Sequence, residues 1–389
     1  MSRISNAIIR RLKHYGFNIK REAEADWKTV TLNPKGTPKG RVLVSYIIEP
    51  FLLPKGNPIP NSHTHYWESI AITNAFLKRG YTVDIISYRN MHFTAKKKYN
   101  YFLGARTNFE SISKQLNTDC VKVCHMDTAH WITNNAATYN RLLAARERKQ
   151  LITGRRLVER NAALEHADLI TVLGNKFTID SYSYANVPTH RIRISTPEKY
   201  DWPEQRDYKQ TRNRFLWFGS IGFVHKGLDL VLEAIANIPE AHLTICGPID
   251  SDPNFKVAYE KELYHTPNID TIGWVDVSGE QFRDILSNTV STLFPSCSEG
   301  GGGSTISCMH GGLIPIVTYE SSVDIGEFGV LIQEGNVKAV EQAIRTILAM
   351  SDEELKTRCL QSWQYARDNH TQETFSHDLD QFLEHELKA

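Results

Sequence analysis

Short apolar runs alternate with longer amphipathic segments along most of this chain. In the first half the apolar runs lie at residues 41–48, 82–87, 121–124, 169–173 and 191–194, with a helical pattern at 66–79. In the second half they lie at 215–219, 242–246, 268–274, 289–294 and 314–318, with helical patterns at 228–238, 279–286 and 305–310. Apolar strands joined by helices are typical of parallel sheets that are covered on both faces. The pattern therefore predicts an α/β protein with doubly wound parallel sheets.

The length of the chain predicts two such domains. A chain of 389 residues is long enough to build two hydrophobic cores. A polar segment at 195–213, which contains Pro197 and Pro203, is the natural linker between them. We therefore expect an N-terminal domain over residues 1–195 and a C-terminal domain over residues 196–371, with helical patterns continuing to the end of the chain.

The most informative motif lies at residues 294–318, FPSCSEGGGGSTISCMHGGLIPIVT. The strand that ends at Phe294 is followed by Glu299, by four consecutive glycines at 300–303 and then by a helix that Ser304 or Thr305 is able to cap. Glycines let a backbone approach a ligand closely, and a helix N-terminus suits a phosphate. The motif predicts an anion site with one carboxylate at its mouth, although a glycine-rich turn in another α/β protein is the alternative.

This segment resembles the signature of the retaining, nucleotide-sugar-dependent glycosyltransferases with the GT-B fold, family four or glycosyl transferases group 1. That signature reads P-S-x-x-E-G-F-G-x-P-x-x-E-A-M-A-x-G-x-P-V-V. The matching residues, with one extra residue before the last, are Pro295, Ser296, Glu299, Gly300, Gly302, Met309, Gly311 and Pro315. The second glutamate of the family's Glu-x7-Glu motif falls on Ser307. A hydroxyl therefore stands where the family usually holds the nucleotide ribose with a carboxylate.

The segment from Gly219 to Gly227 resembles the family's G-R-x-x-x-x-K-G motif. The resemblance assigns the donor diphosphate to Gly222, Lys226, Gly302, Gly303 and Ser304, and the donor sugar and nucleotide to Trp274, Val275, Gly301 and Ser307. The family's arginine falls on Ser220, so one diphosphate cation is absent or comes from elsewhere. Lys226 and a helix N-terminus stabilise the charge that grows on a leaving diphosphate. Glu299 is the expected catalytic carboxylate, which orients the sugar and favours a cationic centre.

The first half of the chain holds the other predicted site residues. The strand at 121–124 leads into His125, and it resembles the family's strand that ends in a histidine facing the donor sugar. His125 is then catalytic, with Asp127 and His130 in reach of the cleft, although a histidine that ends a strand for structural reasons is the alternative. The proline-rich loop at 49–65 carries His63 and His65, which we expect to line the acceptor side of the cleft.

We expect no metal ion and no other cofactor. His63 and His65 are two residues apart, and no third ligand is evident nearby. The nucleotide-diphosphate sugar is a substrate, and the lysine and the helix dipole take the place of a metal ion at its diphosphate.

Charge is divided unevenly between the two halves of the chain. Residues 1–195 contain 30 Lys and Arg against 14 Asp and Glu, a net charge of +16, and residues 196–389 contain 15 against 30, a net charge of −15. The basic clusters are Arg10-Arg11-x-Lys13, Lys96-Lys97-Lys98, Arg146-x-Arg148-Lys149 and Arg155-Arg156. Three uses of this charge compete: attraction between the lobes, docking on an anionic membrane, and binding of an anionic acceptor or a nucleic acid. We expect no nucleic acid, because no recognised motif accompanies the charge.

Residues 4–15 have apolar positions at helical spacing with basic residues among them, which predicts a helix lying on a membrane or packed on its own domain. No apolar run approaches the roughly 18 residues that a membrane span needs, and the N-terminus lacks a signal-peptide pattern. The six cysteines are scattered along the chain, which suggests buried thiols in a reducing cytosol. We therefore expect a cytoplasmic protein, with peripheral attachment to the inner face of the membrane as an option that the family resemblance favours.

The resemblance implies a GT-B fold, in which two Rossmann-like domains face each other across a cleft. It assigns the acceptor to the N-terminal domain and the donor to the C-terminal domain, and it implies that a final helix over residues 372–389 packs back on the first domain. The implied activity is transfer of a sugar from a nucleotide-diphosphate sugar to a glycan or lipid-linked acceptor, with retention of configuration. A non-catalytic sugar-nucleotide or glycan-binding protein and a GT-B nucleotide-sugar epimerase are the alternatives.

Overall fold

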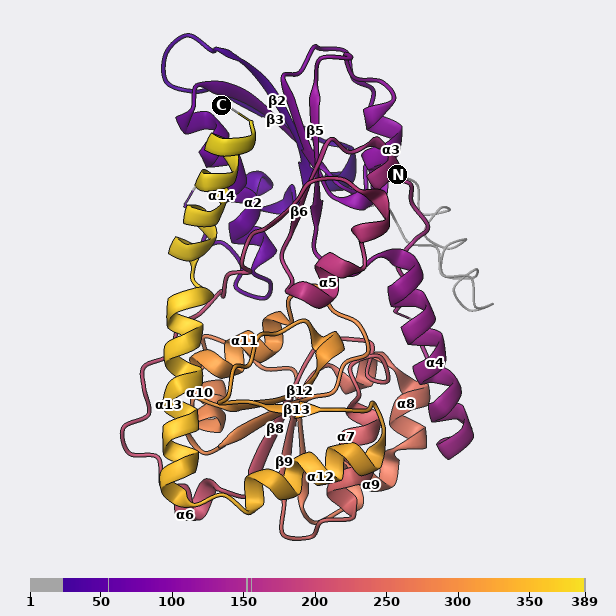
Figure 1. Cartoon of the computed structure of the whole chain (residues 1–389), viewed down its shortest axis with the longest axis vertical. Helices are drawn as coiled ribbons and strands as arrows, with labels where there is room; N and C mark the ends of the chain where they lie inside the picture. Colours follow the sequence, from indigo (N-terminus) through magenta and orange to yellow (C-terminus); the bar gives the residue numbers. More distant parts are fainter. Residues whose placement is uncertain (1–23, 55, 152, 155, 388–389) are drawn as a thin grey trace.

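The chain forms two α/β lobes with a cleft between them (Figure 1). The computed structural model describes residues 24–54, 56–151, 153–154 and 156–387. The helix predicted at residues 4–15 lies outside the described residues. Each lobe contains a mostly parallel sheet with helices packed around it, as the apolar pattern predicts.

The N-terminal lobe contains a seven-stranded sheet in the order β1-β3-β2-β4-β5-β6-β7. Its strands are β1 (Thr29–Leu32), β2 (Gly40–Tyr46), β3 (Tyr81–Ser87), β4 (Tyr101–Gly104), β5 (Val121–Met126), β6 (Leu169–Val172) and β7 (Thr189–Arg191). The edge strand β1 runs antiparallel to β3, and the other neighbours are parallel. All seven residues of β3 are buried, so this strand shows no alternation of exposed and buried positions.

The C-terminal lobe contains a six-stranded parallel sheet in the order β10-β9-β8-β11-β12-β13. Its strands are β8 (Arg214–Phe218), β9 (His242–Cys246), β10 (Ile269–Gly273), β11 (Ser291–Phe294), β12 (Ile314–Thr318) and β13 (Val330–Ile332). The central strands β11 and β12 are buried along their whole length. The loop between them carries the glycine-rich motif, so the motif lies where the parallel strands end at the cleft.

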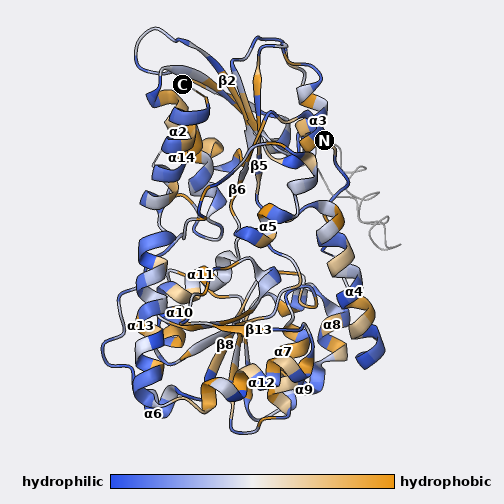
Figure 2. Ribbon diagram, in the orientation of Figure 1, coloured by the Kyte–Doolittle hydropathy of each residue, from blue (hydrophilic) through white to orange (hydrophobic). Residues whose placement is uncertain are grey.

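Helices cover both sheets. In the N-terminal lobe they are α2 (His65–Lys78), α3 (Arg106–Ser113), α4 (Trp131–Lys149) and α5 (Lys176–Asp180). In the C-terminal lobe they are α6 (Tyr208–Thr211), α7 (Leu228–Ala236), α8 (Pro253–Ala258), α9 (Glu260–His265), α10 (Glu280–Ser287), α11 (Gly303–His310), α12 (Val337–Leu348) and α13 (Asp352–Asn369). The strands inside each lobe are mainly apolar, and the helices around them carry both polar and apolar residues (Figure 2).

The last helix, α14 (Gln372–Glu386), returns to the N-terminal lobe and packs against α2. The chain bends after α13, and the Thr371 side chain caps α14 by accepting a hydrogen bond from the Thr374 backbone amide. Arg79 at the end of α2 forms an ion pair with Asp380 at 2.7 Å. The described part of the chain contains no helix that is both long enough and apolar enough to cross a membrane.

Helix α4 is the main element that the apolar pattern did not predict. It leaves the N-terminal lobe and runs down the side of the C-terminal lobe, next to α8 (Figure 1). In its last turn Arg148 pairs with Asp229 and Glu233, and Lys149 pairs with Glu262 at 2.6 Å. The basic end of α4 is therefore bound to acidic residues of the other lobe.

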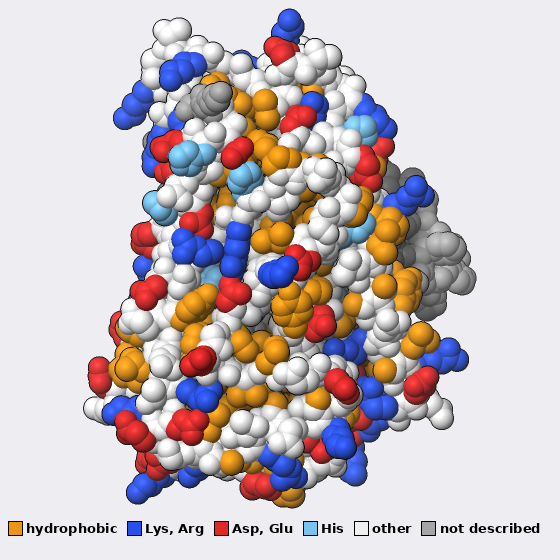
Figure 3. Space-filling model, viewed as in Figure 1, with side chains coloured by type: hydrophobic (Ala, Val, Ile, Leu, Met, Phe, Trp, Pro, Cys, Tyr) orange, Lys and Arg blue, Asp and Glu red, His pale blue; other side chains and the backbone are white. Residues whose placement is uncertain are grey.

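These pairs account for part of the opposite charge of the two halves. Arg193 pairs with Asp378 at 2.7 Å, and Arg191 pairs with Asp324. On the face shown in Figure 3, Lys and Arg side chains are interspersed with Asp and Glu side chains. The structure thus supports attraction between the lobes as one use of the charge, and docking on a membrane stays a prediction.

Candidate active site

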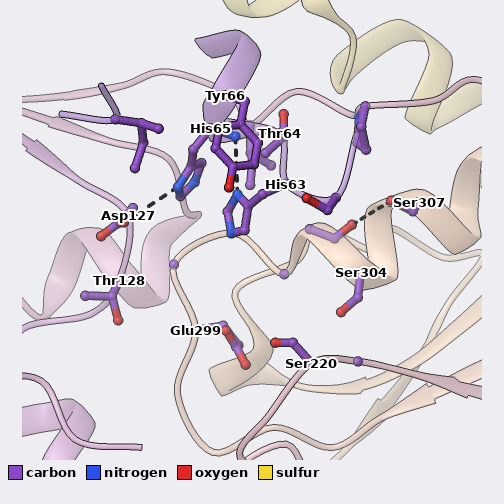
Figure 4. A pocket seen from close by; sticks show the side chains of 18 of the residues that line it. His63, Thr64, His65, Tyr66, Asp127, Thr128, Ser220, Glu299, Ser304 and Ser307 are labelled. Carbon is purple, nitrogen blue, oxygen red and sulfur yellow. Dashed lines mark hydrogen bonds and ion pairs between the residues drawn. The ribbon is translucent and has the colours of Figure 1, made fainter. Parts of the chain in front are cut away.

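A cavity of about 690 Å³ lies between the lobes, where the strands of both sheets end. Most of the residues that the sequence predicts for the site line it. These are His63, His65, Asp127, Lys226, Trp274, Val275, Glu299, Gly302, Gly303, Ser304 and Ser307. Figure 4 shows His63 pointing into the space between the N-terminal lobe and the side chains of Ser220, Glu299 and Ser304.

Four predicted residues do not line the cavity. Gly222 lies in the loop that leads to Lys226, and Gly301 lies in the glycine run after Glu299. His125 has no exposed surface, because Tyr46 packs edge-on against its ring at 5.2 Å and its Nδ1 is bonded to the Thr171 hydroxyl at 2.8 Å. His130 is the N-cap of α4 and accepts a hydrogen bond from the Ile132 amide. Neither histidine lines the cavity in this structure, and the roles predicted for them stay predictions.

The glycine run brings backbone close to the other lobe and starts α11. A β-carbon at Gly300 would lie 2.3 Å from the backbone carbonyl group of Asp127, so only glycine fits between the lobes at this point. Gly301 has a φ of 134° and Gly302 a φ of 56°, which side chains rarely adopt. The turn aims the first amides of α11 at the cavity, and amides at this position have no acceptor within the helix. A helix end with free amides of this kind suits an anion.

A buried ion pair lies next to this helix end. Lys226, at the end of the loop that follows β8, donates to Glu299 Oε1 at 2.7 Å, and the Ser296 hydroxyl donates to the same oxygen at 3.0 Å. Lys226 also lies 4.9 Å over the ring of Phe294. The two side chains are only 6% and 9% exposed, so their charges interact with little screening by solvent.

The charges in this cluster change the proton affinities of its members. Burial raises the pKa of Glu299, but Lys226 and then Arg156 outweigh burial and hold that pKa well below its usual range. Burial, followed by repulsion from Arg156, lowers the pKa of Lys226 to about 8. Glu299 is therefore ionised at any physiological pH, and Lys226 holds its proton less tightly than a lysine on the surface.

Arg156 was not among the residues predicted for the site. It lies on the segment that follows α4, lines the cavity, and pairs with Glu299 Oε2 at 3.6 Å. The sequence marked Arg155-Arg156 only as a basic cluster. No local pattern shows that the segment folds back along α4 into the cleft, so sequence reasoning had no signal for this position.

The two departures from the family motif have simple structural settings. Ser220 is exposed in the cavity wall. Ser307 is buried on α11 and donates its hydroxyl to the Gly303 carbonyl one turn earlier, at 3.1 Å. Its hydroxyl proton is therefore engaged within the helix. Trp274 lies at the rim with 65% of its surface exposed, beside the buried Val275.

The N-terminal side of the cavity is built differently. Asp127 follows β5 and forms an ion pair with Arg106, the first residue of α3, which sequence reasoning also missed. Burial raises the pKa of Asp127, but Arg106 outweighs burial and holds it at about 2. His65 Nδ1 lies 3.8 Å from Asp127 Oδ2, and its ring lies 4.1 Å from that of His63. Burial and the neighbouring His63 lower the pKa of His65 well below its usual value, so His65 is neutral.

Behind this wall, Glu68 of α2 is hydrogen-bonded to Ser195, the last residue of the predicted N-terminal domain, and to Thr64. Its Oε1 accepts hydrogen bonds from the Ser195 amide at 3.1 Å, the Ser195 hydroxyl at 3.0 Å and the Thr64 hydroxyl at 3.3 Å. Burial raises the pKa of Glu68 to about 7 in spite of these bonds. Among the described residues, no group of three or more His, Cys, Asp or Glu side chains is arranged to hold a metal ion.

Residues 212–350, which form most of the C-terminal lobe, match the family model of glycosyl transferases group 1. This match covers the loop with Lys226 and the whole glycine-rich motif. No curated protein sequence matches the chain significantly.

Solved structures resemble the whole two-lobed chain. Sucrose-phosphate synthase from Thermosynechococcus elongatus is 15% identical with a TM-score of 0.65, and the alignment covers 91% of this chain and 100% of that one. A glycosyltransferase from Rickettsia africae is 12% identical with a TM-score of 0.59 over 89% and 98% of the two chains. Anabaena HepE, solved in complex with UDP and glucose, is 10% identical with a TM-score of 0.55 over 89% and 99%. The chain therefore has the GT-B fold, as the sequence predicts.

Proposed function

We propose that this protein is a glycosyltransferase that moves a sugar from a nucleotide-diphosphate sugar to an acceptor hydroxyl. The observation that carries the proposal is the buried Lys226–Glu299 pair beside the N-terminus of α11, facing a cavity between two lobes. The match of residues 212–350 to glycosyl transferases group 1 supports it, because that region supplies both members of the pair.

The donor side of the cavity carries the groups that departure of a diphosphate requires. Transfer breaks the bond from the anomeric carbon to the diphosphate oxygen, and the bonding electrons stay with the diphosphate. Negative charge grows on this oxygen as the bond breaks, and Lys226 and the free amides of α11 stabilise it. Preorganised charges of this kind supply a large part of catalysis. The acceptor oxygen bonds to the same carbon, and its proton passes to the departing diphosphate.

Glu299 cannot act as a general acid, because its pKa is held far below neutrality. As a permanent anion it orients sugar hydroxyls and stabilises positive charge at the anomeric carbon. We propose that the reaction retains the anomeric configuration and uses no metal ion. Analysis of the product anomer by NMR, and turnover in the presence of EDTA, test these two points.

The acceptor is proposed to be a glycan or a lipid-linked glycan bound by the N-terminal lobe. That wall of the cavity presents imidazole, phenol and carboxylate groups from His63, His65, Tyr66 and Asp127, which suit an acceptor rich in hydroxyls. Lys96 and Lys98 are exposed on the same lobe and are the proposed contacts with an anionic membrane. Co-sedimentation with phosphatidylserine vesicles, compared with neutral vesicles, tests the membrane contact.

The decisive assay measures nucleotide release from a panel of UDP-, GDP- and ADP-sugars, with glycans and a total glycolipid extract as acceptors. UDP-glucose is the first donor to test, because HepE was solved with UDP and glucose. We expect one donor to be turned over by the wild type and not by Lys226→Ala or Glu299→Gln. Lys338→Ala, an exposed lysine on α12, is the matched control and is expected to retain full turnover.

Two outcomes would replace the proposal. A donor that binds without any turnover indicates a sugar-nucleotide-binding protein. A donor that is converted into another nucleotide sugar, with no sugar transferred, indicates an epimerase.

A further inference from the structure

The cavity holds a second cation next to Glu299, and it comes from the opposite lobe. Arg156 Nη2 lies 3.6 Å from Glu299 Oε2, while Lys226 Nζ lies 2.7 Å from Glu299 Oε1. One carboxylate therefore has a cation at each oxygen. Since a single carboxylate neutralises only one of two cations, this corner of the cavity retains a positive charge beside the N-terminus of α11.

The position of Arg156 is fixed by α4. The Asn134 side-chain amide donates to the Arg156 carbonyl at 3.2 Å. Two residues further on, the Asn135 side chain accepts from the Val158 amide at 2.8 Å and donates to the Val158 carbonyl at 2.9 Å. These bonds hold the returning segment against the helix, so its side chains are placed at the cavity by fixed backbone.

The helix that holds Arg156 is itself anchored on the donor-binding lobe. Besides the ion pairs at its C-terminal end, the Thr138 hydroxyl lies 2.8 Å from Nδ1 of His225, the residue just before Lys226. His225 Nε2 donates in turn to the Ser298 carbonyl at 2.6 Å, just before Glu299. Helix α4 is therefore hydrogen-bonded both to Arg156 and to His225, and His225 is bonded to the residue before Glu299.

The donor loop leaves room for the arginine. Gly222 has a φ of 93°, and a β-carbon there would lie 3.1 Å from Cδ of Arg156 and 3.3 Å from its Cβ. The arginine stem thus lies along the bare backbone of the loop that leads to Lys226. Among the described residues its guanidinium makes one ion pair, and 39% of the side chain is exposed to the cavity and solvent. An arginine has five N–H donors, so most of them are free to bind another anion.

We propose that Arg156, which comes from the N-terminal half of the chain, binds the donor diphosphate. It acts together with Lys226 and the N-terminus of α11. This inference rests on the proposed function of the cavity. It assigns to Arg156 the second diphosphate cation that Ser220 does not supply. A planar guanidinium suits two phosphate oxygens at once, whereas Lys226 provides a point charge.

The arrangement has a functional consequence. Because Arg156 lies on the segment that follows α4 in the N-terminal half of the chain, and the other donor groups belong to the C-terminal lobe, a diphosphate in this position contacts both halves of the chain. Arginine also stays charged at every physiological pH, while burial and Arg156 itself lower the pKa of Lys226 to about 8. The site therefore keeps a cation for the diphosphate above pH 8, where Lys226 loses its proton.

The test is calorimetric titration of the full chain with UDP, GDP and ADP, and with the monophosphate of whichever base binds. Arg156→Ala is expected to weaken binding of the diphosphate by about 10- to 100-fold, the range for a charge-assisted hydrogen bond. Binding of the monophosphate is expected to weaken by less than about 3-fold, because we expect the guanidinium to contact the second phosphate, which the monophosphate lacks. Arg160→Ala, an exposed arginine of the same segment that does not line the cavity, is the matched control and should bind as the wild type does.

Two further variants separate a phosphate contact from a purely structural role. Arg156→Lys is expected to recover part of the diphosphate affinity, and the double variant Arg156→Ala/Ser220→Arg to recover most of it, because Ser220 lines the same cavity. Unchanged diphosphate affinity in Arg156→Ala, or an equal loss for both nucleotides with no rescue, would overturn the inference and leave the proposed function standing. A wild type that binds none of the nucleotides would overturn the proposed function and the inference together.

Discussion

The two walls of the cleft use the same kind of sheet edge for opposite purposes. On each wall a carboxylate follows a central parallel strand: Glu299 after β11 and Asp127 after β5. Each pairs with a cation, Lys226 and Arg106 respectively. Burial and Arg156 lower the pKa of Lys226, so its proton is weakly held, whereas arginine remains charged. The wall of the C-terminal lobe has a second cation, Arg156, beside its carboxylate, whereas Arg106 and Asp127 on the other wall pair one to one.

Two buried glutamates sharpen the same contrast. Glu299 has cations at both of its oxygens, which outweigh burial and hold its pKa far below the usual value. Glu68 has only neutral donors on its Oε1, and burial raises its pKa to about 7. Similar burial therefore yields a permanent anion on one side and a titrating group on the other. The difference lies in the partners of the two carboxylates: Glu299 has Lys226 and Arg156 beside it, and Glu68 accepts from amide and hydroxyl donors.

The largest expected effect separates the two ion pairs. Lys226→Ala is expected to lower kcat/KM by about 10²- to 10³-fold, both for sugar transfer and for nucleotide release without acceptor, because it removes charge stabilisation of the leaving group. Arg106→Ala is expected to lower transfer while sparing acceptor-free release, because its partner Asp127 lies on the acceptor wall. Steady-state kinetics with and without acceptor measures both. Equal losses in both variants would contradict this division of the cleft, and thermal unfolding checks that each variant is folded.

The pH dependence of stability tests the contrast between the glutamates. The pKa of Glu68 is raised to about 7 in the folded state, so its contribution is fully present below the unfolded pKa of about 4.5 and is lost as pH rises through 7. Relative to Glu68→Gln, the wild type is expected to lose about 2 to 3 kcal/mol of unfolding free energy between pH 5 and pH 8. Urea unfolding at several pH values measures the difference. A constant difference over this range would show that Glu68 is ionised throughout.

The contact between the walls is tested at Gly300. Gly300→Ala brings a β-carbon within 2.3 Å of the Asp127 backbone, and overpacking of this kind costs about 1 to 3 kcal/mol. Because the loop cannot shift without moving Glu299, we also expect reduced turnover. Gly154→Ala, outside the cavity, is the matched control, since its β-carbon would lie 3.4 Å from Asp252 Oδ2, an ordinary contact. A Gly300→Ala protein as stable and active as Gly154→Ala would mean that the lobes do not touch here during turnover.

The smallest expected effect is at Ser307. Its hydroxyl already donates to the Gly303 carbonyl, so Ser307→Ala is expected to change nucleoside diphosphate affinity less than about 3-fold. Titration calorimetry measures it beside the wild type. A loss of 10-fold or more would show that the serine has taken over the ribose contact after all.

The parts of the account that the sequence predicted are those with a local signal. Buried parallel strands are continuous apolar runs, so β8 to β12 were recognised close to their actual bounds. The glycines before α11 predicted that the backbone comes close to another group, and the structure shows Gly300 against the Asp127 backbone. The cavity accordingly includes Lys226, Glu299 and most of the other predicted residues.

The parts that were missed depend on tertiary contacts. Helix α4 has a mixed polar sequence, because three of its four buried positions are polar: Asn134, Thr138 and Arg141. Arg156 reaches the cavity only because α4 holds the segment that follows it. Tyr46, distant in sequence, packs edge-on against His125, so residue spacing did not show that this side chain has no exposed surface. Long-range packing of this kind leaves no trace in residue spacing.

The most direct test of the account is a crystal structure of the protein with the nucleoside diphosphate that calorimetry identifies. We expect the diphosphate at the N-terminus of α11, within hydrogen-bond distance of Lys226, with the base near Val275 and Trp274. A diphosphate bound on the opposite wall, beside Arg106 and away from Glu299, would contradict it.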